Sequence, residues 1–204
     1  TISWIANASG FWDVASNWQD TLGVSRLPHA TDDALIDRGV SNPTITIRTA
    51  VAVHSLLSTE ILSGISGATL TLNGDSELDA ASSFVSSSIN GPGTLTNVGT
   101  LTLQYSIVNA PLVNQGVILV RGGSVNAFNG SFTTTTGSTL RLQADAFLDA
   151  SVLNITGASG FTNNGAIELT AINGGGQTAT LNVTVGLLVN AAGGTISILA
   201  GNGG

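Results

Sequence analysis

Beyond about residue 65, short runs of alternating apolar and polar residues recur along the chain, separated by Asn and Gly. The clearest copies share one order: an apolar residue, then Asn two positions later, Gly two positions after that, and an apolar-x-apolar end. This order occurs at residues 95–103, 112–120 and 161–169, with looser copies at 132–142 and 188–198. The apolar-x-apolar end has the period of two that indicates a strand with one buried face.

The Asn-x-Gly step inside each copy predicts a sharp corner, because Asn and Gly tolerate positive φ better than other residues. If equivalent corners stack above one another, their Asn side chains can form a hydrogen-bonded ladder. The corner residues that we expect in this ladder are Asn97, Gly99, Asn114, Gly116, Asn163, Gly165 and Asn190.

The spacing of the copies predicts an all-β parallel β-helix, or β-solenoid. Their starts are separated by 17, 20, 29 and 27 residues, as expected for stacked coils whose loops differ in length. Roughly seven to nine coils would form a rod about 35–40 Å long. A β-sandwich is the alternative, since it also has short alternating strands with frequent turns, but it gives no reason for one corner to recur.

Composition supports a folded β protein. Apolar residues make up 42% of the chain, whereas charged residues make up only 8% and Lys is absent. Surface helices need a charged face, so few are expected. A net charge of −7 and scattered arginines disfavour nucleic acids and anionic membranes as partners, and no apolar stretch is long enough to cross a bilayer. The absence of Cys excludes disulfides and thiolate chemistry.

Residues 1–50 differ from the rest and predict a capping segment, followed by solenoid coils over residues 51–204. All three tryptophans lie in this segment, and large rings can cover the open end of an aliphatic core. Polar side chains nearby can bind loose backbone donors. The expected cap residues are Trp4, Trp12, Asn17, Trp18, Pro28 and Asp32. The alternative is a sugar-stacking platform made of the three tryptophans.

The same segment resembles one found near the start of large bacterial exported β-helical proteins. The residues that carry the resemblance are Trp4, Trp12, Asn17-Trp18, Pro28 and the run Asp32-Asp33-Ala34-Leu35-Ile36. The Asn-x-Gly copies behind it are similar to repeats of autotransporter passengers and filamentous-haemagglutinin-type adhesins. This resemblance implies a right-handed β-helix on the cell surface that serves display, adhesion or matrix building.

Acidic residues provide the main candidates for chemistry. Asp75, Glu77 and Asp79 alternate, so on one strand they would share a face and could bind Ca²⁺. The simpler interpretation is a solvated strand face. The sequence does not exclude Asp145 and Asp149 as an acid–base pair for glycoside hydrolysis, but nothing in it supports this pair. His29 and His54 give only a weak metal signal, because they lie far apart in the sequence and the chain has no Cys.

These observations lead us to expect a non-catalytic, extracellular structural protein without a cofactor. In this hypothesis the solenoid self-associates through exposed coil ends into a fibre, sheath or surface stalk. The first alternative is an adhesin or glycan-binding module of a larger surface protein. The second is a polysaccharide lyase or hydrolase, although the charge-neutralising Lys or Arg that such enzymes need is scarce.

Overall fold

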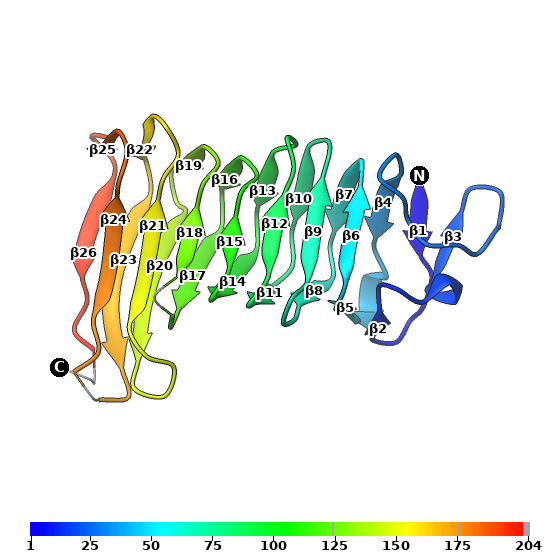
Figure 1. Cartoon of the computed structure of the whole chain (residues 1–204), viewed down its shortest axis with the longest axis horizontal. Helices are drawn as coiled ribbons and strands as arrows, with labels where there is room; N and C mark the ends of the chain where they lie inside the picture. Colours follow the sequence, from blue (N-terminus) through cyan, green and yellow to red (C-terminus); the bar gives the residue numbers. More distant parts are fainter. Residues whose placement is uncertain (124, 175, 202–204) are drawn as a thin grey trace.

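The computed structural model describes residues 1–123, 125–174 and 176–201. Figure 1 shows its strands side by side in one elongated stack, with the N-terminus at one end and the C-terminal region at the other. Two short 3₁₀ helices, η1 (Ala15–Asn17) and η2 (Gly39–Ser41), lie near the N-terminal end.

Three long faces make up the stack. Sheet A runs in the order β3 (Trp18–Asp20), β1 (Ile2–Trp4), β4 (Asp33–Ile36), β7 (Ser55–Ser58), β10 (Ser76–Leu78), β13 (Leu95–Asn97), β16 (Leu112–Asn114) and β19 (Phe132–Thr134). A two-stranded sheet, β22 (Gly160–Asn163) and β25 (Leu187–Asn190), continues this face beside β19.

Sheet B, the second face, runs in the order β2 (Gly10–Phe11), β5 (Thr44–Ile47), β8 (Ile61–Gly64), β11 (Ser82–Val85), β14 (Thr100–Gln104), β17 (Val117–Arg121), β20 (Thr139–Asp145), β23 (Ala166–Ile172) and β26 (Thr195–Ile198). Sheet C, the third, contains β6 (Ala50–Val53), β9 (Thr69–Leu72), β12 (Ser88–Asn90), β15 (Ile107–Val108), β18 (Asn126–Phe128), β21 (Ser151–Ile155) and β24 (Ala179–Val183).

The chain winds through the three faces in turn, so β4 to β24 form seven successive three-strand coils. Within the described part of the chain, every strand pair is parallel except β1 with β3. The predicted parallel β-helix is therefore confirmed, and the alternative of a β-sandwich is wrong. Regular coils already begin at β4, so residues 33–50, which we predicted as part of the cap, contribute strands to the stack.

The sequence copies lie in register as predicted. Leu95 pairs with Leu112, and Leu112 pairs with Phe132 one coil further on. Phe161 likewise pairs with Leu188. The unequal separations of the copies thus come from loops between strands, because the strands themselves stay aligned.

The core is a set of columns of inward side chains that run along the axis. In sheet B one column contains Leu101, Ile118, Leu140 and Ile167, all with no exposed surface. Each such aliphatic side chain contributes about 1.5–3 kcal/mol of burial free energy. Where a large ring enters a column, its neighbour is small: a Cβ on Gly64 would lie 2.3 Å from Cδ1 of Phe84.

Candidate functional site: the open end of the solenoid

The N-terminal end of the stack is closed by the three tryptophans. Their exposed fractions are 1% for Trp4, 2% for Trp12 and 0% for Trp18. The ring centroids of Trp4 and Trp18 are 5.3 Å apart at 89°, and those of Trp12 and Trp18 are 4.6 Å apart. The Trp18 indole also donates a hydrogen bond to the carbonyl of Trp12 at 2.8 Å. All three rings are therefore buried at this end, as a cap requires, and no indole face is free for a sugar-stacking platform.

Polar side chains of the cap bind nearby backbone groups: Asp32 accepts from a backbone N–H as predicted, whereas Asn17 donates to a carbonyl. Asp32 accepts two hydrogen bonds from Arg26, at 2.5 and 2.8 Å, and one from the backbone of His29 at 2.8 Å. The Arg26 hydrogen bond is the main reason that the pKa of Asp32 falls to about 2. Asn17 donates to the carbonyl of Phe11 at 3.2 Å, and Pro28 is buried. The antiparallel strand β3 pairs with β1 and ends sheet A on this side.

The predicted Asn ladder is present inside the stack. Asn97 donates from Nδ2 to Oδ1 of Asn114 at 2.9 Å, and Asn163 donates to Oδ1 of Asn190 at 2.8 Å. Between these pairs the column passes through Thr134, whose hydroxyl donates to Asn163 at 3.0 Å. Asn97, Asn114 and Asn163 have no exposed surface, so the ladder provides partners for amide groups within the core. Among the described residues, Oδ1 of Asn97 has no hydrogen-bond partner.

We predicted the corner glycines because Gly tolerates positive φ, and this reason is wrong. Gly99, Gly116 and Gly165 do not have positive φ. They are instead points where successive coils approach closely. A Cβ would lie 2.3 Å from the carbonyl oxygen of Asp79 at Gly99, and 2.1 Å from that of Gly99 at Gly116. At Gly165 it would lie 2.4 Å from the Ser138 carbonyl oxygen.

Sequence reasoning missed a second ladder on the outer surface of sheet C. Asn109 donates to Asn90 at 2.6 Å, Asn129 donates to Asn109 at 2.7 Å, and the hydroxyl of Thr156 donates to Asn129 at 2.6 Å. These residues follow the apolar end of their strands, outside the Asn-x-Gly pattern. A search for Asn at equal offsets after each sheet C strand would have found them.

Over residues 176–201, the described C-terminal stretch, the end of the stack has no such cover. The inward column of sheet B continues from Ile167, with no exposed surface, to Ile196, which is 50% exposed. The neighbouring column continues from Leu169 to Ile198, which is 89% exposed. No strand of the described chain pairs with the outer edges of β24, β25 and β26. We call the surface formed by these three strands the open end.

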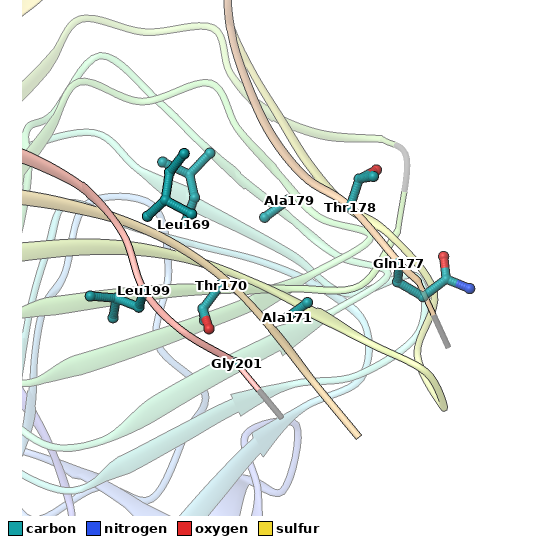
Figure 2. A pocket seen from close by; sticks show the side chains of 9 residues that line it. Leu169, Thr170, Ala171, Gln177, Thr178, Ala179, Leu199 and Gly201 are labelled. Carbon is teal, nitrogen blue, oxygen red and sulfur yellow. The ribbon is translucent and has the colours of Figure 1, made fainter. Parts of the chain in front are cut away.

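A hollow lies within the open end, where sheet C stops one strand before the other faces. Its volume is about 310 Å³. Figure 2 shows Leu169, Thr170 and Ala171 of β23, Leu199 after β26, and Gln177 to Ala179 around this hollow. The lining contains no ionisable side chain, and the sequence has none after Glu168. The arrangement can therefore bind an apolar, strand-forming segment but offers no acid–base group.

The structure does not arrange the acidic triplet as a metal site. Glu77 lies on β10, whereas Asp75 precedes this strand and accepts a hydrogen bond from the backbone of Thr94 at 3.0 Å. Partial burial, followed by its contact with Asp79, raises the pKa of Glu77. Over the part of the chain that is described, no three His, Cys, Asp or Glu residues are placed to hold a metal ion. The structure thus gives no support to the calcium candidate Asp75, Glu77 and Asp79.

The candidate acid–base pair has a structural role instead. Asp145 is 2% exposed and accepts hydrogen bonds from Asn173 at 3.0 Å, the backbone of Phe147 at 3.0 Å and Arg121 at 3.2 Å. These contacts, that of Asn173 first, lower the pKa of Asp145, whereas a general acid needs a raised pKa. Asp149 forms an isolated backbone bridge with Asp145 and closes the turn.

The two histidines have different neighbours in the structure. His54 Nδ1 lies 2.7 Å from Asp33, which also accepts a hydrogen bond from the Ser55 hydroxyl at 2.7 Å. His29 lies in the exposed loop whose backbone N–H binds Asp32. Neither histidine belongs to a metal-binding group within the described ranges.

Comparison with known proteins finds no matching family model, no matching curated protein and no matching solved structure. In the described part of the chain, no helix has the length and apolar character required to span a membrane. The fold and the site define the class of this protein: a parallel β-helix whose N-terminal end is covered and whose last described strands have unpaired outer edges.

Proposed function

We propose that this protein is an extracellular structural protein whose solenoid self-associates through its open end. The observation that carries the proposal is the exposed inward column: Ile198 is 89% exposed although its register neighbour Leu169 is packed against the core. Burying such side chains, together with the unpaired strand edges, favours the addition of another β surface. Location outside the cell rests on the resemblance of residues 4–36 to exported β-helical proteins.

Charge favours a second copy of the chain as the partner. The protein carries a net charge of −7, which would repel identical copies at most surfaces. All twelve carboxylates lie at or before Glu168, so the open end carries none of them. The strands β24, β25 and β26 also lack the Lys and Pro residues that commonly protect exposed edges. Two copies can therefore meet at their open ends without like-charge repulsion.

The test is the concentration dependence of assembly, measured by sedimentation velocity and electron microscopy. We expect dimers for the wild type and monomers for Ile198→Lys, because a charge at the edge must be desolvated on pairing. Leu22→Lys is the matched control, since Leu22 is 86% exposed in the N-terminal loop. A wild type that stays monomeric at high concentration, or equal assembly of Ile198→Lys and wild type, would contradict the proposal.

A further inference from the structure

The corner between sheets B and C uses left-handed backbone in successive coils, and one of these positions holds an aromatic residue. Ser86 follows Val85, Tyr105 follows its register partner Gln104, and Gly122 takes the same place one coil later. Their φ angles are 49°, 51° and 53°. Gly adopts this conformation freely, but a bulky side chain there is strained by about 1–3 kcal/mol. Strain of this kind at one residue points to a role for its side chain.

The Tyr105 ring is held in place beside the chain of the next coil. A Cβ on Gly123 would lie 2.5 Å from Cδ1 of Tyr105, so the ring packs directly on this glycine. The hydroxyl of Tyr105 donates to the carbonyl of Leu148 at 3.4 Å. The residue as a whole still keeps 38% of its surface exposed. It is therefore an oriented aromatic surface that faces solvent in part.

Tyr105 borders a hollow of about 280 Å³ on the outer surface of sheet C, which we call the Tyr105 groove. Hydroxyl groups line the groove: Thr69 and Ser88 lie 3.2 Å apart, and Ser86 stands at the strained corner. Ile107, which is 37% exposed, adds an apolar surface to the groove. The phenol of Tyr105 is the only ionisable group among the lining residues.

We propose that the Tyr105 groove binds a neutral saccharide. Sugar rings have apolar C–H faces that pack on aromatic rings, and their hydroxyls exchange hydrogen bonds with Ser and Thr side chains. The groove supplies both kinds of contact on a rigid scaffold, as small-molecule sites do. It has no cation to bind a uronate or a sialic acid. This binding site lies on the side of the solenoid and does not depend on self-association at the open end.

The chain contains a single Tyr, so labelling with 3-fluorotyrosine places one ¹⁹F reporter in the groove. The probes are neutral hexasaccharides of glucose, xylose and N-acetylglucosamine, with hexagalacturonate as the charged comparison. We expect a saturable ¹⁹F shift with at least one neutral probe and none with hexagalacturonate. Absence of a shift with every neutral probe at millimolar concentration, or an equal shift with hexagalacturonate, would overturn the proposal.

Unlabelled variants, studied by saturation-transfer NMR of the saccharide, separate binding from folding. Tyr105→Gly suits the left-handed backbone, so it should keep the fold and weaken saccharide binding about tenfold. Tyr105→Phe keeps the ring and should retain binding. Phe147→Ala is the matched control, because Phe147 is an 82% exposed aromatic that is not among the residues lining the groove. Undiminished binding by a folded Tyr105→Gly variant would overturn the assignment.

Discussion

At Gly116 the spacing between coils depends on the absence of a single Cβ. An added Cβ would lie 2.1 Å from the carbonyl oxygens of both Gly99 and Val98, which are backbone atoms that cannot rotate away. We therefore expect Gly116→Ala to lower the free energy of unfolding by about 2–4 kcal/mol, as strained and overpacked sites do. Urea unfolding followed by circular dichroism measures this change.

Gly193→Ala is the control for this residue-scale prediction. Gly193 does not have positive φ, and a Cβ there would meet nothing within 4 Å. Its substitution should change the free energy of unfolding by less than about 0.5 kcal/mol. Equal losses for the two variants would show that close approach of the coils is not what the corner glycines provide.

At the scale of elements, the loop that holds the cap depends on ionised carboxylates. The pKa of Asp32 in the folded protein is about 2, below the value of about 4 expected in the unfolded chain. Backbone and Arg26 hydrogen bonds also lower the pKa of Asp20. A depressed pKa stabilises the folded state fully above the unfolded value, and this contribution is lost as the pH falls through the folded value. The cap should therefore lose stability between about pH 4 and pH 2.

Tryptophan fluorescence during urea unfolding reports this loss, because all three tryptophans lie in the cap. Asp32→Asn cannot ionise, so the unfolding midpoint of this variant should fall less steeply between pH 4 and pH 2. It should also be lower than that of the wild type at pH 7, because the charged contact with Arg26 is weakened. The same acid dependence in the variant and the wild type would assign the loss to other carboxylates.

For the whole molecule, stability should vary along the axis. Each coil of a solenoid contacts only its neighbours, so an end coil has one stabilising interface where an inner coil has two. Amides of β26 should therefore exchange with deuterium faster than those of β17, as local opening at the end needs less free energy. Hydrogen-exchange mass spectrometry of peptides covering residues 187–201 and 112–121 makes the comparison.

If copies of the protein assemble through the open end, this difference in hydrogen exchange along the axis should depend on protein concentration. Self-association through the open end should slow exchange in residues 187–201 as the concentration rises, and leave residues 112–121 unchanged. If β26 is already as protected as β17 in dilute protein, the open end is covered within the monomer. If the gradient persists at every concentration, the second copy binds elsewhere or does not bind.

Local patterns were enough to predict much of this architecture. The period-two runs define strands because alternation is set within a few residues. The recurrence of Asn97, Asn114 and Asn163 defines the coil, since only stacking brings such residues together. The tryptophans of residues 4–18 predicted the cap because rings of that size in a charge-poor chain are stabilised by burial.

Tertiary structure alone decided the rest. Gly116 could be needed for positive φ or for the close approach of two coils. Only the distance to a coil 17 residues away distinguishes these roles, and no local pattern contains that distance. The sequence did not exclude Asp145 as an acid, and only the contacts with Arg121 and Asn173 show its structural role. The Tyr105 groove combines residues from three coils, and its strained backbone has no signature in the sequence. Periodicity fixes which residues face inward, but the packing between coils fixes what each one contacts.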